Sequence, residues 1–380
     1  MLLDKYAKAN DLLEAISDEL DIPESMYKAA KSHYESVGKW LAQEGTYFQQ
    51  FNGTIFTQGS FMLGTMIRPY DENQDYDIDL VFRVDIPKGY LSQYDLKNKV
   101  EQRLLESNVY RRLLQPEKQR CWTLKYSNSE RFHLDILPAI PDVDFAVHLN
   151  ESFKLAKELS VDALAITDNK DDHYYNRHGM WPQSNPLGFG NWFKSRMEER
   201  YTILKEAYDI QQVPEYKRKT PLQRVVQILK RHRDMMYGSN GEHKPASIII
   251  TTLAASYYNN EDNIISALSR AVTGINALND DFILKNPAHP DEIFTDKWNN
   301  EPEKRVEFNR WKAQLYRDYS DLVSGDSTRI QKAMYSAFDE SVVKEAAYNL
   351  TNRGSTPSVL YDNKPFVQIK DPIKPYGYSN

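Results

Sequence analysis

Two aspartates alternate with apolar residues in the segment YDIDLVF, which begins at Tyr76. In a β-strand, residues two positions apart point to the same side, so this spacing would place the carboxylates of Asp77 and Asp79 on one face. Carboxylate oxygens are the ligands that hard divalent cations such as Mg²⁺ prefer. The pattern therefore predicts a metal-binding strand. The alternative is an exposed strand face or a turn that binds nothing.

A third acid interrupts a second apolar segment, FHLDILPAI. Because an uncompensated carboxylate is costly to bury, Asp135 predicts either a metal ligand or an ion pair with a nearby arginine, Arg120 or Arg131. Two divalent ions about 3.5–4 Å apart can activate a hydroxyl group and stabilise a departing pyrophosphate. We therefore expect Asp77, Asp79 and Asp135 to be both catalytic and metal-binding, with a pair of Mg²⁺ ions as cofactor and Mn²⁺ as a substitute.

A Gly-Ser pair lies upstream of both acidic segments, in the sequence QGSFM. Gly59 allows close approach of the backbone, and Ser60 can cap a short helix whose first amide groups attract phosphate. Together with Gln58, these residues predict a triphosphate-binding turn. A Gly-Ser pair by itself is more often an ordinary turn. Its position ahead of two acidic strands favours the functional interpretation.

The elements that must position these side chains predict an α/β (α+β) fold with a mixed β-sheet. We expect the strands that begin at Arg120 and Arg131 to form an antiparallel hairpin across the turn SNSE. The chain is expected to divide into residues 1–215, a catalytic core with N-terminal helices, and residues 216–380, a mostly helical lobe. Predicted helices span residues 3–20, 23–51, 94–106, 191–210 and most of 222–349.

Three groups of side chains carry weaker signals. Lys230, Arg231 and Arg233 should project away from the apolar stripe of their helix, where they either reach a phosphate or form a solvated face. His133 is expected to lie off the acidic face, and no histidine is assigned a role. Aromatic residues in or beside the irregular segment 168–190 could stack a nucleobase, although core packing is the commoner role: Tyr174, Tyr175, Trp181 and Trp192.

The composition is that of an ordinary globular protein, with 41% hydrophobic and 27% charged residues among 380. The formal net charge of −6 argues against stable binding of long nucleic acid, which usually requires a basic excess. Cys121 is the single cysteine, so no internal disulfide or Cys-rich zinc site is expected and a cytoplasmic location fits. The longest apolar stretch, residues 246–258, is shorter than the roughly 20 residues of a membrane span and predicts a buried helix without membrane association.

The order of Gly-Ser, alternating acids and a later single acid resembles the nucleotidyltransferase superfamily typified by DNA polymerase beta. More closely, QGSFMLGTMIRP, DYDIDLVFRV, RFHLDILPAIPD and LQRVVQILKRHRDMMY followed by PASIIITTLAA resemble the cGAS/DncV-like nucleotidyltransferases (CD-NTases, SMODS family) of bacterial CBASS antiphage systems. The resemblance covers roughly residues 48–253. It implies a polymerase-beta-like core whose nucleotide cleft is closed by a helical lobe similar to that of oligoadenylate synthase.

The resemblance also implies an activity. Family members condense nucleoside triphosphates into a cyclic di- or trinucleotide messenger and release pyrophosphate, with ATP as the expected substrate here and GTP or pyrimidine nucleotides as further candidates. By motif, the three acids would hold the metals, and Lys230 and Ser247 would contact the donor triphosphate. The implied partners are a regulatory protein and an effector protein that responds to the product. The zinc insertion of the animal DNA sensor is not visible in the sequence, so activation by DNA is not expected.

Two other functions remain open at the level of the sequence. A polymerase-beta-like transferase that modifies an RNA, protein or small-molecule acceptor would keep the same acids, and a labelled acceptor would reveal it. A catalytically inactive nucleotide- or RNA-binding sensor would be expected to have lost one of the acids. The presence of Asp77, Asp79 and Asp135 argues against the inactive sensor.

Overall fold

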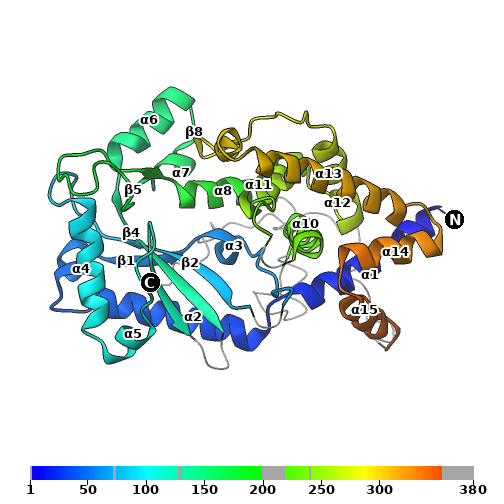
Figure 1. Ribbon diagram of the computed structural model, residues 1–380, viewed down its shortest axis with the longest axis horizontal. Helices are drawn as coiled ribbons and strands as arrows, with labels where there is room; N and C mark the ends of the chain where they lie inside the picture. The colour runs from blue at the N-terminus through cyan, green and yellow to red at the C-terminus, as the bar shows by residue number, and fades with distance from the viewer. Residues whose placement is uncertain (1, 72–73, 127–130, 199–218, 239–240, 353–380) are drawn as a thin grey trace, which may run out of the picture.

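The structure, a computed structural model, describes residues 2–71, 74–126, 131–198, 219–238 and 241–352. Within these residues, a β-sheet and its covering helices lie beside a group of helices from the second half of the chain (Figure 1). The predicted mixed α/β architecture with a helical lobe is therefore confirmed. The predicted boundary at residue 215 lies outside the described residues.

The main sheet has the strand order β1-β2-β4-β5-β6, with β3 also paired to β4. Strands β2 and β4 run parallel and the other pairs are antiparallel, so the sheet is mixed, and the predicted hairpin of β3 and β4 is confirmed. The strands are β1 (Thr54–Thr57), β2 (Tyr76–Arg83), β3 (Trp122–Tyr126), β4 (Phe132–Pro141), β5 (Leu164–Ile166) and β6 (Gln183–Ser184).

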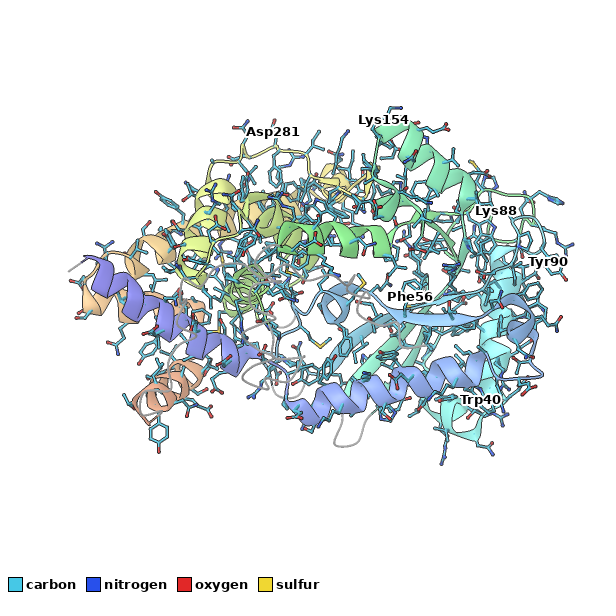
Figure 2. The ribbon with its side chains drawn as sticks, turned by 180° about the vertical axis from the view of Figure 1, so that it is seen from behind. Trp40, Phe56, Lys88, Tyr90, Lys154 and Asp281 are labelled. Carbon is cyan, nitrogen blue, oxygen red and sulfur yellow. The ribbon has the colours of Figure 1, made fainter. Side chains whose placement is uncertain are left out.

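One face of this sheet is closed by helices. Alternate residues of β2, namely Ile78, Leu80 and Phe82, enter a buried core shared with these helices, because residues two apart on a strand share a face. Trp40 of α2 packs against Tyr110 of α5 with ring centroids 6.1 Å apart. Figure 2 shows Trp40 near the end of α2. The helices on this side are α2 (Glu24–Leu41), the 3₁₀ helix η1 (Tyr47–Phe51), α4 (Gln93–Leu105) and α5 (Asn108–Leu113).

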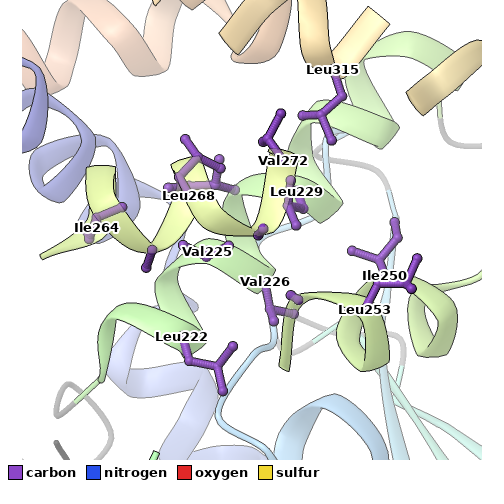
Figure 3. Packing of buried hydrophobic residues seen from close by; sticks show 14 of the residues in the cluster. Leu222, Val225, Val226, Leu229, Ile250, Leu253, Ile264, Leu268, Val272 and Leu315 are labelled. Carbon is purple, nitrogen blue, oxygen red and sulfur yellow. The ribbon is translucent and has the colours of Figure 1, made fainter. Parts of the chain in front are cut away.

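The second core is helical and is built around α10 (Pro221–Tyr237). Leu222, Val225, Val226 and Leu229 of α10 pack among apolar residues of the neighbouring helices (Figure 3). Helix α1 (Leu2–Leu20) contributes Leu13 to this core and not to the core under the sheet, although it opens the chain. The other helices of this part are α11 (Ser247–Tyr257), α12 (Ile264–Asn276), α13 (Pro302–Leu322), α14 (Ser327–Ala337) and α15 (Glu340–Asn352).

Shorter elements complete the fold and include three corrections to the predictions. The helix predicted over 23–51 is split between α2 and η1, and the helix predicted from residue 191 begins earlier, at Pro186, after Asn185 caps it. A small hairpin of β7 (Lys285–Asn286) and β8 (His289–Ile293) was not predicted within the helical lobe. The remaining elements are α3 (Gly59–Met62), α6 (Val143–Phe153), α7 (Lys157–Ser160), α8 (Pro186–Arg196) and η3 (Asp296–Asn299).

The apolar stretch at residues 246–258 forms the buried helix α11, as predicted. No helix in the described parts of the chain is long and apolar enough to cross a membrane.

Candidate active site

Asp79 and Asp135 face one another across the parallel pair of strands β2 and β4. The register pairs Asp79 with Asp135 and Asp77 with His133, so the two acidic segments of the sequence meet side by side. Their apolar neighbours in the sequence, such as Ile78, Leu134 and Ile136, are buried and fix this register. The sheet therefore brings together the carboxylates that the sequence predicted to act together.

Gly59 places the start of α3 directly against Asp79. The backbone N–H of Gln58 donates to the backbone oxygen of Asp79 at 2.8 Å, and Gly59 follows with a φ of +59°. A methyl group at Gly59 would lie 2.6 Å from Oδ2 of Asp79. Only glycine combines this left-handed conformation with so close an approach to the acid.

Ser60 does not cap α3, so that part of the prediction was wrong. Gln58 occupies the N-cap position without a side-chain hydrogen bond, and Ser60 is the second residue of the helix. Ser60 nevertheless lines the cavity beside the acids, whereas Gln58 contributes its backbone to the turn and does not line the cavity. The turn itself is thus present, with Gln58 rather than Ser60 at the N-cap position, and its binding of phosphate stays a prediction.

Asp135 is held by two side chains of the β3 region. Nζ of Lys118 lies 3.1 Å from Oδ1 and 3.0 Å from Oδ2 of Asp135, and the hydroxyl of Thr123 donates to Oδ1. The sequence analysis did not single out Lys118, because the segment that carries it has no periodic pattern. Arg120, one of the two partners considered for Asp135, instead pairs with Asp168 at 2.9 Å.

The charge of the acidic cluster is only partly compensated. Burial, together with the neighbouring carboxylates of Asp135 and Asp77, raises the pKa of Asp79 to about 6, while Lys118 and Lys230 oppose the change. A carboxyl group that is hard to ionise beside other carboxylates is the electrostatic signature of a site that gains from a bound cation. Of the three acids, Asp79 therefore lies in the environment that most favours a bound metal ion.

His133 lies on the acidic face, contrary to the prediction. It is two residues from Asp135 on β4, so the two side chains point to the same side. Its Nδ1 lies 3.4 Å from Oδ1 of Asp77, and its Nε2 lies 3.0 Å from Oδ2 of Asp75, which also pairs with Lys125 at 3.1 Å. Asp75 is thus engaged by Lys125 and His133 just before β2.

The donor set fits a divalent cation, although the three acids are not drawn tightly together. The side chain of Asp77 is 71% exposed, and that of Asp135 is 20% exposed and bonded to Lys118. In the portion of the chain that is described, no three acidic, histidine or cysteine side chains form a preformed metal cluster. The available ligands are carboxylate oxygens, which Mg²⁺ and Mn²⁺ prefer, and Mg²⁺ usually keeps several waters and binds substrate phosphates as well.

A cavity of about 410 Å³ opens between the acidic strand β2, helix α3 and helices α10 and α11. Gly59, Ser60, Lys230 and Ser247, four of the five predicted nucleotide-binding residues, line it. Asp77 and Asp79 line the same cavity, whereas Asp135, opposite Asp79 on the neighbouring strand β4, does not. The fold therefore gathers segments that are far apart in the sequence around one space.

The basic residues of α10 are buried, which excludes the solvated face, one of the two alternatives that the sequence left open. Lys230 is 6% exposed and its Nζ donates to the backbone oxygen of Thr65 at 2.9 Å. Burial, together with the charge of Arg233 nearby, lowers the pKa of Lys230 to about 7. Arg231 donates to the backbone oxygen of Arg68 at 2.6 Å. A buried ammonium group at the wall of a cavity favours binding of an anion.

Ser247 begins α11 and is oriented by Arg233. Nη1 of Arg233 donates to the hydroxyl of Ser247 at 2.8 Å and to the backbone oxygen of Pro245 at 3.0 Å. The residue at the N-cap position is Ala246, which offers no side-chain hydrogen bond. The first turn of α11 thus presents its hydroxyl and its amide groups near the cavity.

Several residues that line the cavity were not predicted. They come from the segment between α3 and β2, from the first residue of β2 and from the segment after α10, and include Arg68, Tyr70, Gln74, Tyr76 and Lys244. The aromatic residues of segment 168–190 do not line it. Tyr174 and Trp181 are buried, as core packing requires, and Tyr175 is exposed.

Comparison with known proteins agrees with this geometry. Residues 53–138 match the family model described as "Cyclic GMP-AMP synthase DncV-like, nucleotidyltransferase domain". The chain is 30% identical over 335 residues to a c-di-GMP synthase of Roseivirga ehrenbergii, covering 85% of this chain and 82% of that protein.

Two solved structures share the fold. The structure of CdnG from Bradyrhizobium diazoefficiens in complex with GTP matches with a TM-score of 0.68 and 18% identity, covering 90% of this chain and 99% of that one. The structure of Vibrio cholerae DncV with a linear intermediate matches with a TM-score of 0.55 and 17% identity, covering 90% of this chain and 89% of that one.

Proposed function

The chain belongs to the cGAS/DncV-like nucleotidyltransferases, which are cyclic oligonucleotide synthases, and from this premise we propose how its own residues carry the reaction. The observation that supports the proposal is the cavity whose lining brings Asp77 and Asp79 together with Gly59, Ser60, Lys230 and Ser247. A nucleoside triphosphate needs both kinds of partner, namely cationic and hydroxyl groups for its phosphates and acids for its metal ions.

In the proposed complex, the donor triphosphate lies along the first turn of α3. Gly59 lets the phosphates approach the backbone, Ser60 and Ser247 donate hydroxyl hydrogen bonds, and Lys230 supplies a positive charge. Asp77 and Asp79 would hold two Mg²⁺ ions and Asp135 would complete the coordination of one. When bound, these ions would lower the pKa of the acceptor hydroxyl and stabilise the departing pyrophosphate.

The acceptor hydroxyl of one nucleotide then attacks the α-phosphorus of the other in line with the leaving pyrophosphate. A new phosphodiester bond forms, the bond to the pyrophosphate breaks, and the hydroxyl proton leaves to solvent. A second attack of the same kind closes the ring. The residues of the cavity contribute mainly by holding the reacting atoms in line.

We further propose GTP, beside ATP, as a substrate, since the relatives are named for c-di-GMP or were solved with GTP. The reaction would take place in the cytoplasm with Mg²⁺, and its product would act on an effector protein in antiphage defence. We also retain residues 1–215 and 216–380 as the two functional parts, with the modification that α1 packs in the helical core. A regulatory protein partner remains part of this proposal.

Lys230 leads to a prediction about the proton balance of nucleotide binding. Its pKa of about 7 in the free protein means that it is charged below this pH and increasingly neutral above it. A bound triphosphate stabilises the charged form, so at pH 8 binding of GTP should draw up to one proton onto Lys230, and affinity should fall by up to about tenfold per pH unit above 7. Calorimetry of GTP binding without metal, in buffers of different ionisation enthalpy, measures this uptake.

The controls for this experiment are two methionine variants. Lys230→Met should bind GTP more weakly and take up correspondingly fewer protons at pH 8. Lys125→Met, which alters a lysine that pairs with Asp75 and does not line the cavity, should behave as the wild type. Equal proton uptake by the wild type and Lys230→Met would contradict the assignment of Lys230 to the phosphate site.

A further inference from the structure

The ammonium group of Lys118 contacts the carboxylate of Asp135 as a bound cation would. Its ammonium group lies within 3.1 Å of both carboxylate oxygens, and Thr123 donates to one of them, so the groups around Asp135 that the structure describes already compensate its charge. The same ammonium opposes the rise in the pKa of Asp79, the neighbouring acid. Lys118 therefore acts electrostatically on both strands of the acidic pair.

The backbone that carries Lys118 is fixed by a fully buried lysine of α4. Lys97 has an exposed fraction of 0%, and its Nζ donates to the backbone oxygens of Lys118 at 2.6 Å and Gln119 at 2.9 Å. The same Nζ pairs with Glu117 at 2.9 Å. A buried ammonium group needs such partners, and here they anchor three consecutive residues.

A second set of contacts fixes the far side of this segment. The side chain of Gln119 donates to both carboxylate oxygens of Asp168, at 3.0 and 2.9 Å, and Arg120 donates to the same carboxylate at 2.9 Å. In contrast, the side chain of Lys118 is 48% exposed. The segment is thus rigid in its backbone, and the long side chain of Lys118 is the part that has room to move.

We propose that Lys118 is a placeholder cation, which compensates the charge of Asp135 before metal binds and competes with the metal for this carboxylate. This inference rests on the proposed function, because it assumes that Asp79 and Asp135 hold a metal ion. A divalent ion bound by Asp135 would meet the positive charge of Lys118, so the ammonium group must withdraw as the ion arrives. Lys118 thereby sets the metal concentration at which the site fills, and acts as a positioning residue through Asp135.

Binding of Mn²⁺ without nucleotide tests this inference independently of activity. The free ion is quantified by its electron paramagnetic resonance signal. Lys118→Met, which keeps the aliphatic length and removes the charge, should bind Mn²⁺ about five- to tenfold more tightly than the wild type. Lys118→Arg, which keeps the charge, should remain near the wild type.

Lys125→Met is the matched control. Lys125 is also a lysine of the β3 region, is 42% exposed and pairs with Asp75, which is not a proposed ligand. Its removal should leave the affinity for Mn²⁺ within about twofold of the wild type. A general loss of positive charge would instead tighten binding in both methionine variants equally, and this result would overturn the specific role of Lys118.

The outcomes separate this inference from the proposed function. If the wild type binds Mn²⁺ and Asp135→Asn weakens that binding, but Lys118→Met binds no more tightly, the placeholder role is wrong and the metal site stands. If the wild type and Lys118→Met both fail to bind Mn²⁺ at millimolar concentration, the placeholder role and the metal site of the proposed function are both contradicted.

Discussion

Replacing Asp77 and Asp79 together by asparagine should lower the rate of product formation by at least about 1000-fold, because the stabilisation supplied by metal ions at such a site is worth several kcal/mol. Asparagine has nearly the volume of aspartate but lacks the charge that binds a divalent ion. The measurement is the initial rate of pyrophosphate release with GTP and ATP and either Mg²⁺ or Mn²⁺. A double variant with wild-type activity would refute the site assignment.

The single variant Asp79→Asn tests how the charge of Asp79 affects the free energy of unfolding. Because the pKa of Asp79 is raised from 3.8 to about 6 in the folded protein, ionising it costs free energy of folding above pH 6 and nothing below pH 3.8. Asp79→Asn should therefore raise the free energy of unfolding by about 1–3 kcal/mol at pH 8, and this gain should vanish near pH 4. Urea unfolding without metal at both pH values measures the difference.

Such a gain in stability together with a loss of activity would distinguish a functional acid from a structural one. A structural acid normally stabilises the fold through its partners, so its removal lowers stability. If Asp79→Asn lowers the free energy of unfolding at pH 8, the acid is compensated by its neighbours and the argument for a cation site at Asp79 fails.

Gly59→Ala is the second substitution with a large expected effect. The added methyl group would lie 2.6 Å from Oδ2 of Asp79, and the φ of +59° already disfavours any side chain. Either α3 or Asp79 must therefore move. We expect the rate of pyrophosphate release to fall about 100-fold, because displacements of about 1 Å at an active site have effects of this size. The free energy of unfolding should fall by about 1–2 kcal/mol from backbone strain.

Gly45→Ala distinguishes the effect of the contact with Asp79 from the effect of backbone strain at a positive φ. Gly45 has a φ of +80°, also in the left-handed region, but a methyl group there would have no neighbour within 4 Å. This variant should lose comparable stability and keep its activity in the same assay. Equal losses of activity in both variants would show that strain alone, and not the approach to Asp79, explains the effect of Gly59→Ala.

The acids and their strands could be predicted from the sequence because their signal is local. Alternation of Asp77 and Asp79 with buried apolar residues fixes both the strand and the face, and the same pattern marks Asp135. The mixed sheet and the helical second half follow from periodicity of the same kind. The register that places Asp79 opposite Asp135 depends on pairing between distant strands, which the sequence implied only through the resemblance to a family.

The errors arose where tertiary contacts decide the environment. For the basic run of α10 the sequence left open a solvated face or contact with a phosphate. The structure excludes the solvated face, because the segment after α3 covers Lys230 and Arg231 and offers backbone oxygens. Lys118 carries no pattern at all, and its position becomes evident only from Lys97, which anchors the neighbouring backbone. His133 is a different case, since alternation along β4 already places it beside Asp135.

The most direct test of the central claim is the identity of the product. The purified protein is incubated with the four nucleoside triphosphates, one labelled on its α-phosphorus at a time, and Mg²⁺ or Mn²⁺, then treated with phosphatase and examined by mass spectrometry. We predict a phosphatase-resistant product with the mass of a cyclic di- or trinucleotide, containing guanine or adenine and absent from the Asp77→Asn, Asp79→Asn double variant. If phosphatase released all of the label in reactions with protein that is known to bind GTP, the claim that these residues form a cyclic oligonucleotide synthase would be contradicted.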